Sequence, residues 1–126
     1  MAVKQRSFGT FSGGREAKLY ELSNRAGACA CFTDLGAAWV GMKLPAEGGK
    51  TVDVLLGYDD PAIYERNPGC LGGIVGRHAN RIAGACFELN GKHYQLAKNQ
   101  GENSLHSGPD GWWKRLFRAE VLEEEN

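Results

Sequence analysis

The fold is decided by the stretch CFELNGKHYQ, residues 86–95. Its Asn90-Gly91 pair is typical of a type I′ turn, in which both central residues need a positive φ angle. With these two residues as the loop, the flanking segments pair as antiparallel strands, and Phe87 lies opposite Tyr94. One face of the pair is then apolar and the other is polar, as a half-buried sheet requires. The stretch therefore predicts a β-hairpin.

The same register explains His93. It places this residue opposite Glu88 on the polar face, where a cross-strand pair contributes at most about 1 kcal/mol. A histidine that acts as a ligand or as a general acid needs a cleft and a partner. We therefore expect His93 to be an exposed strand residue.

Outward from the hairpin, the chain alternates short apolar runs with turn signals. Its 18 glycines are spread along all 126 residues, with only 4 prolines. This pattern is typical of an all-β sandwich or barrel. We expect strands over residues 17–23 and 37–45, and a buried strand over the apolar run 52–56. A short helix is expected over 62–66, with Asp60 as its N-cap and Pro61 at its first position.

Charge and hydropathy exclude two classes of protein. Lysine and arginine number 15, as do aspartate and glutamate, so the formal net charge is zero. A nucleic-acid-binding protein needs surplus positive charge to displace counterions from phosphate. No apolar run approaches the roughly 20 residues that span a bilayer. No apolar stretch follows the first ten residues, so we expect no signal peptide. These features predict a cytoplasmic protein with neither nucleic acid nor membrane as a partner.

The four cysteines fit a reducing compartment. They are Cys29, Cys31, Cys70 and Cys86. Without a secretory signal, two disulfides are not expected, and we predict small buried thiols. The spacing of Cys29 and Cys31 does not form a metal site, because no second cysteine or histidine pair completes a tetrahedron.

Two polar, glycine-punctuated segments flank the hairpin, GRHANRI at residues 76–82 and NQGENSLHSGPDG at residues 99–111. The hairpin between them can bring both segments to one edge of a sheet. Their asparagine, arginine and histidine side chains offer donors and acceptors suited to a polyhydroxylated ligand. Alternatively, Arg77 and Arg81 only cap carbonyl groups and pair with carboxylates on the surface.

The order of three motifs resembles the aldose 1-epimerase (galactose mutarotase) family. The motifs are GRHANRIA, FELNGKHYQL and NSLHSGPDG, and the resemblance runs over residues 71–117. It implies an all-β fold that is part of a galactose mutarotase-like antiparallel β-sandwich. It also implies interconversion of the α and β anomers of hexoses such as galactose and glucose, by acid–base ring opening. Neither a cofactor nor a metal is expected.

The resemblance assigns roles to four residues. His106 matches a histidine that binds the substrate close to the sugar ring oxygen, so it is the candidate catalytic residue. Asn80 and Arg81 match a pair that contacts sugar hydroxyls, and Arg77 is expected to support them. His78 fills a variable position of the motif and is expected to be structural or exposed.

The sequence departs from the family pattern in two places. Ser107 stands where the family usually has glycine, which adds a hydroxyl and restricts the backbone beside His106. Trp112-Trp113 replaces a Phe-Asp pair before Lys114. We expect these two indoles to be part core and part surface.

The resemblance also implies that residues 1–126 form a single, truncated N-terminal portion of the sandwich domain. Family members run well over twice this length, and their catalytic glutamate base and principal acid histidine follow the matched region. The acidic run 123–125 lacks the motif that surrounds that glutamate. The partners expected are a hexose and either a second copy or a complementing C-terminal polypeptide.

Two other functions stay open from the sequence. The chain is either a non-catalytic carbohydrate-binding or regulatory β-sandwich module, or a structural β-domain that rebuilds the site with another polypeptide.

Overall fold

The computed structural model describes residues 2–122, which form mostly antiparallel sheet with one short α-helix. The largest element is a five-stranded sheet whose strands follow one another in chain order. Its strands are β1 (Ala2–Phe11), β2 (Arg15–Ser23), β3 (Cys29–Thr33), β4 (Trp39–Pro45) and β5 (Thr51–Asp53). The all-β expectation is confirmed, and the strands expected over 17–23 and 37–45 correspond to β2 and β4.

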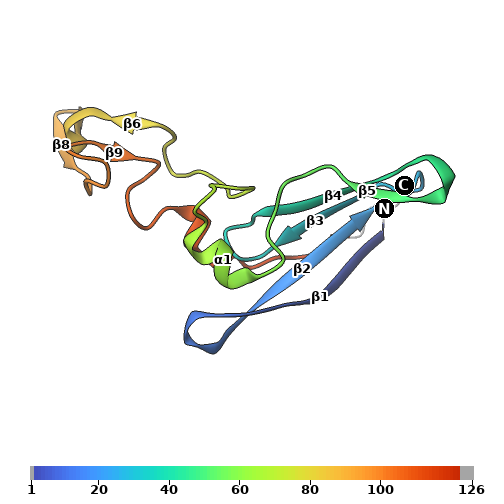
Figure 1. Ribbon diagram of the computed structural model, residues 1–126. Coiled ribbons are helices and arrows are strands. Elements are labelled where there is room, and N and C mark those ends of the chain that lie inside the picture. The colour runs from blue at the N-terminus through green and yellow to red at the C-terminus, as the bar shows by residue number, and fades with distance from the viewer. Residues whose placement is uncertain (1, 123–126) are drawn as a thin grey trace.

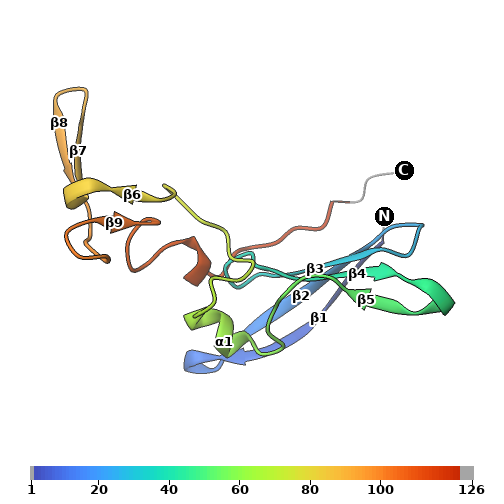
Figure 2. The same ribbon diagram turned by 45° about the horizontal axis from the view of Figure 1, so that its top comes forward.

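The remaining elements lie beyond the sheet. After helix α1 (Pro61–Arg66), two small strand pairs form at the opposite end of the molecule from β5 (Figures 1 and 2). One pair joins β6 (Arg81–Ile82) to β9 (Ser104–Leu105), and the other joins β7 (Cys86–Leu89) to β8 (Lys92–Gln95). Short 3₁₀ turns connect several of these elements, at Ser12–Gly14, Glu47–Gly49, Ala83–Ala85 and Trp112–Lys114.

The core lies where α1 covers one end of the large sheet. Its buried residues are Phe11, Ala17, Leu35, Ala38 and Tyr64. Tyr64 is the largest of them, and its hydroxyl accepts a hydrogen bond of 3.0 Å from the Tyr58 N–H. This bond lets the phenol be buried without an unsatisfied polar group. Burial also raises the pKa of Tyr64.

Local sequence sets the position of α1. Asp60 caps the helix by accepting a hydrogen bond of 2.8 Å from the Ala62 N–H, and Pro61 takes the first helical position. The predicted helix start is therefore confirmed. On β1, a bulge leaves Phe8 without a partner on β2, and the Phe8 ring lies 6.0 Å from that of Tyr64. The bulge thus helps to fix the helix against the sheet.

The prediction of a buried strand over 52–56 is wrong. Only Thr51–Asp53 form a strand, and it pairs with β4 alone as an edge of the sheet. The Asp53 carboxylate accepts hydrogen bonds from the Met42 and Leu55 N–H groups, which lower the pKa of Asp53. Beyond Val54, whose N–H still bonds the Met42 carbonyl at 2.9 Å, the chain leaves the ladder. Leu56 is consequently 79% exposed.

The predicted hairpin is confirmed in its turn and register. Asn90 and Gly91 have φ angles of 52° and 70°, and the strands pair Phe87 with Tyr94 and Glu88 with His93. The rings of Phe87 and Tyr94 stack at 4.9 Å, and His93 is exposed as expected. The expectation that one face is half-buried is wrong for Phe87, which is 38% exposed. The hairpin projects from the rest of the chain (Figure 2).

The prediction that all four cysteines are small buried thiols is only partly correct. All four are free thiols, but Cys31 alone is buried. Burial, together with the neighbouring Cys29, raises the pKa of the Cys31 thiol to about 11. Cys70 is exposed because it lies in the loop after α1.

Gly36 contacts both the segment that leaves the large sheet and the segment that returns to it. The Gly36 carbonyl accepts a hydrogen bond of 3.3 Å from the Ile74 N–H, and its own N–H donates to the Arg115 carbonyl at 2.7 Å. A Cβ at position 36 would lie 2.3 Å from the Trp113 carbonyl oxygen. Only glycine therefore allows the returning segment to approach so closely.

A membrane-crossing helix is not found in the part of the chain that the structure describes, residues 2–122.

The turn can be tested by replacing Gly91 with valine. The φ angle of 70° opposes a β-branched residue, and nothing lies within 4 Å of a Cβ placed there, so the strain comes from the backbone alone. We expect a cost of about 1–2 kcal/mol in hairpin formation. Amide hydrogen exchange in β7 and β8 should accelerate about 10-fold. Gly91→Asn, which tolerates this conformation, is the matched control. Equal protection in the valine variant would contradict the turn assignment.

Candidate functional site

The β6–β9 pair brings the two polar segments together. Its register sets Arg81 opposite Leu105, so the residue before β6 meets the residue after β9. These residues are Asn80 and His106. The expectation that the segments meet at one sheet edge is confirmed as geometry.

Asn80 and His106 are joined by two hydrogen bonds. The His106 N–H donates to the Asn80 carbonyl at 2.9 Å, and the Asn80 N–H donates to His106 Nδ1 at 2.9 Å. Because Nδ1 accepts this bond, the neutral ring carries its proton on Nε2. The ring therefore presents an N–H donor on its far side. Both residues hold left-handed backbone, with φ angles of 60° and 50°.

Arg81 is oriented by its neighbours. Its Nη1 donates to Asn80 Oδ1 at 3.1 Å, and its Nε donates to Gln100 Oε1 at 2.5 Å. The side chain is exposed, and these bonds leave other guanidinium N–H groups to donate elsewhere. These hydrogen bonds, which join residues within the described range 2–122, run to amides and an imidazole rather than to a carboxylate.

Asn99 is a supporting residue that sequence reasoning missed. Its side chain accepts from the Leu105 N–H at 2.7 Å and donates to the Leu105 carbonyl at 2.9 Å. The amide thus acts as a strand partner on the free side of β9 and fixes the residue before His106. The sequence could have indicated this role, because Asn99 lies in the polar segment 99–111 and asparagine side chains often bond nearby backbone groups.

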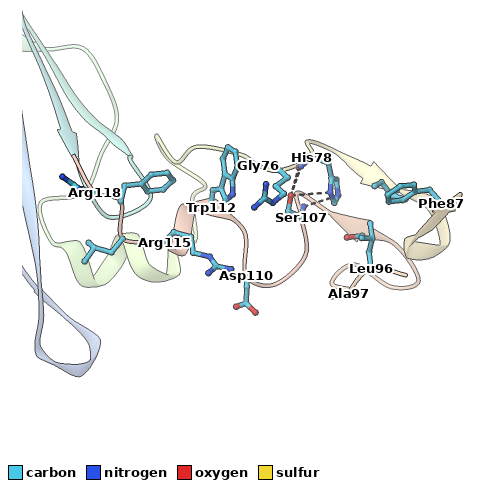
Figure 3. Close-up of a pocket in the computed structure, with 15 residues that line it drawn as sticks. Gly76, His78, Phe87, Leu96, Ala97, Ser107, Asp110, Trp112, Arg115 and Arg118 are labelled. Carbon is cyan, nitrogen blue, oxygen red and sulfur yellow. Dashed lines mark hydrogen bonds between the residues drawn. The ribbon is translucent and has the colours of Figure 1, made fainter. Parts of the chain in front are cut away.

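Arg77 and His78 lie beside this group rather than within it. Both line a hollow of about 790 Å³ between the large sheet and the small strand pairs (Figure 3). The His78 side chain faces Ser107, the residue after His106 (Figure 3). His78 is expected to be either structural or exposed. The structure supports the structural role, since the residue is half-buried and hydrogen-bonded.

The hollow differs from the Asn80–His106 group in its lining. Its walls are largely apolar and include Ile82, Phe87, Leu96, Trp112, Leu116 and Phe117. Asn80, Arg81 and His106 do not line it. We take the hydrogen-bonded group as the candidate binding site for a polar ligand because it offers convergent donors, whereas the hollow offers mainly apolar surface.

The two tryptophans have the expected mixed environments. Trp112 is 37% exposed and lies over Gly76, where its ring would be 2.2 Å from a Cβ. Trp113 is half-buried and packs beside Gly73 and Gly36. Asp110 lines the hollow and is exposed.

Metal ligation finds no support in the described residues. Across positions 2–122, groups of three or more histidine, cysteine, aspartate or glutamate residues close enough to hold an ion do not occur.

Fold and site together define a class: an antiparallel β protein that presents amide, guanidinium and imidazole donors where two short strands meet. The sequence profile of the family described as aldose 1-epimerase matches residues 18–126. The chain belongs to the aldose 1-epimerase family.

Individual relatives agree with this assignment. The chain is 36% identical to an aldose 1-epimerase of Escherichia coli over 105 residues, which is 83% of this chain and 30% of that protein. It is 42% identical to an aldose 1-epimerase of Haemophilus influenzae over 111 residues, 88% of this chain and 32% of that one. A solved aldose epimerase homologue from C. elegans is similar with a TM-score of 0.71 and 33% identity, over 83% of this chain and 32% of that chain. The chain thus spans about a third of the length of the relatives it matches.

Asn99→Ala tests the support of β9. Losing this side chain leaves the Leu105 N–H without its acceptor, so we expect the Leu105 amide to exchange at least about 10-fold faster with solvent. Lys98→Ala is the matched control, because the Lys98 side chain bonds Glu102 on the surface, where it lowers the pKa of that carboxyl. Equal exchange rates in the two variants would show that Asn99 does not hold the strand.

Proposed function

We propose that this chain supplies the sugar-contacting portion of an aldose 1-epimerase that interconverts the anomers of hexoses such as galactose and glucose. The observation that carries the proposal is the fixed imidazole of His106, whose Nδ1 is occupied by the Asn80 N–H. Its Nε2–H is therefore available to a ligand. A sugar ring oxygen is an acceptor that suits this donor.

The proposed chemistry requires two proton movements. A base takes the proton of the anomeric hydroxyl while an acid protonates the ring oxygen, which opens the ring. Rotation about the bond next to the anomeric carbon and reclosure then give the other anomer. Positioned acid and base groups each contribute typically 10²–10⁴-fold to the rate.

His106 serves this chemistry by binding the ring oxygen and supporting its protonation. Asn80 and Arg81 bind sugar hydroxyls, since each has donors directed by the bonds described above. Arg77 supports the segment from the side of the hollow rather than touching the sugar.

The base and the second acid come from outside these residues. We propose that residues 1–126 act as one truncated N-terminal portion, completed by a C-terminal polypeptide or by a second copy of this chain. Support comes from the share of the relatives that the chain covers, 30% in the Escherichia coli protein. Exposed apolar side chains also support it, with Leu89 on the hairpin at 55%. The acidic run 123–125 lies outside the described residues.

A second function is favoured by the same site. The hydrogen bonds that orient Asn80, Arg81 and His106 run to amides and an imidazole rather than to a carboxylate. Such a group can hold a sugar without transferring two protons. A non-catalytic carbohydrate-binding or regulatory module is therefore the alternative proposal.

The cellular setting is proposed from the cysteines and the charge. Free thiols persist in a reducing compartment, and all four cysteines are free, so we place the protein in the cytoplasm. The balanced charge opposes nucleic acid as a partner. The proposed reaction uses neither cofactor nor metal.

His106→Ala tests the assignment in a completed enzyme. Loss of the Nε2–H donor should lower kcat/KM for mutarotation at least about 10-fold, or about 1.4 kcal/mol of transition-state stabilisation. Polarimetry corrected for spontaneous rotation measures the rate. His106→Asn tolerates the left-handed backbone, and should show a similar loss. His93→Ala, on the exposed face of the hairpin, should leave the rate unchanged. An unaltered rate in both position-106 variants would remove His106 from the site.

The isolated 126-residue chain should show no mutarotation above the buffer rate. Adding the C-terminal portion of a family member, covalently or in trans, should restore activity, because it supplies the missing base. Light scattering shows whether the active species is a complex. Sugar binding measured in parallel by NMR separates the alternatives, since a binding module retains the sugar but gains no activity on complementation. Activity that persists in the isolated chain through further purification would overturn the proposal, and Asp110 would become the candidate base.

A further inference from the structure

We propose that His78 is a positioning residue, which clamps Ser107 and thereby holds His106 in its binding conformation. The inference rests on the proposed function, because it concerns the orientation of the residue assigned to the sugar. His78 itself does not touch the sugar in this proposal.

The clamp consists of bonds between one histidine and one serine. The Ser107 N–H donates to His78 Nε2 at 3.2 Å. The Ser107 hydroxyl accepts from the His78 N–H at 2.8 Å and donates to the His78 carbonyl at 3.2 Å. His78 Nδ1 lies 3.4 Å from the same hydroxyl oxygen. Figure 3 shows both side chains at the rim of the hollow.

One tautomer satisfies the whole arrangement. Because His78 Nε2 accepts from the Ser107 N–H, its ring proton belongs on Nδ1, where it points at the Ser107 oxygen. That oxygen has two lone pairs, which the His78 N–H and the Nδ1–H can share. The hydroxyl proton is then free to bond the His78 carbonyl. The opposite tautomer would set two N–H groups against each other.

The clamp reaches His106 through the peptide bond that follows it. The Ser107 N–H belongs to the peptide that joins His106 to Ser107, so fixing this N–H fixes the ψ angle of His106. The Asn80 N–H fixes the His106 ring from the other side. His78 and Asn80 are two residues apart, and one short segment therefore holds both the backbone and the ring.

The clamp also accounts for a backbone conformation that serine disfavours. Ser107 has a φ angle of 72°, directly after the 50° of His106. Glycine would adopt this angle freely, whereas serine needs compensating contacts. His78 supplies those contacts. The residue that departs from the usual glycine and the residue at the variable position thus work as a pair.

The test uses NMR of the imidazole rings in the 126-residue chain, at about pH 8.5, where histidine side chains are ordinarily neutral. The chain has 3 histidines, so each ring can be assigned. A ring held in one tautomer shows widely separated shifts for its two nitrogens, and a mobile ring shows averaged shifts. We expect a wide separation for His106 in the wild type.

His78→Ala should narrow the separation of the His106 nitrogen shifts. Adding Ser107→Gly to this variant should recover part of the separation, because glycine takes the left-handed angle without the clamp. His93→Ala should match the wild type. A merely structural loss at position 78 would not be rescued by glycine at position 107. Unchanged His106 shifts in His78→Ala, or narrowing that glycine does not rescue, would overturn the proposal.

If His78→Ala does not fold, His78→Phe gives the same answer. It keeps the ring volume and removes both ring nitrogens, so the Ser107 N–H loses its acceptor and the His106 separation should narrow, and a wild-type spectrum would overturn the clamp. No sugar is involved in these measurements. The NMR test of the clamp and the kinetic test of His106→Ala are therefore independent. Failure of the clamp can be told apart from failure of the proposed function.

Discussion

The structure depends on a close approach between two chain segments at Gly36. This residue lies between the buried Leu35 and the turn into β4, and its carbonyl and N–H groups bond Ile74 and Arg115. Leu35 also forms an antiparallel β-bridge with Leu116, so the returning segment lies beside the buried Leu35. Closing a loop of some 40 residues costs on the order of 3 kcal/mol in chain entropy. The bonds at Gly36 and the packing beside it offset that cost.

This tie explains how a site can form away from the hydrophobic core. The small strand pairs contribute little buried apolar surface, and Phe87 and Leu89 on the hairpin are exposed. Their order comes instead from hydrogen bonds of Asn99, Asn80 and His78 to the segment around His106. Such polar ties are directional, so they fix ring and guanidinium orientations that apolar packing would leave free.

Local rules in the sequence were sufficient for the elements with short-range causes. The Asn90-Gly91 turn and the Asp60 cap each depend on residues a few positions apart, and both were predicted correctly. Strands β1 and β3 were not predicted, because their pairing depends on neighbours distant in the chain. The run 52–56 is apolar enough to predict an interior strand, whereas β5 pairs with β4 alone and so forms an edge of the sheet. For the candidate site, the meeting of Asn80 and His106 followed from the hairpin between their segments. The roles of Asn99 and the His78–Ser107 pair did not, because they depend on side-chain bonds that no local pattern encodes.

The double attachment at Gly36 has a consequence for protein engineering. A segment whose two ends bond the same residue presents neighbouring ends, and such ends suit transplantation. Residues 75–114 can be regarded as a cassette, with the donor group of Asn80, Arg81 and His106 carried on its own small frame. Grafting it onto another sheet would require a recipient glycine where Gly36 stands, since a side chain there would meet the Trp113 carbonyl. Conversely, replacing residues 75–114 with a short linker would leave the strands of the five-stranded sheet intact.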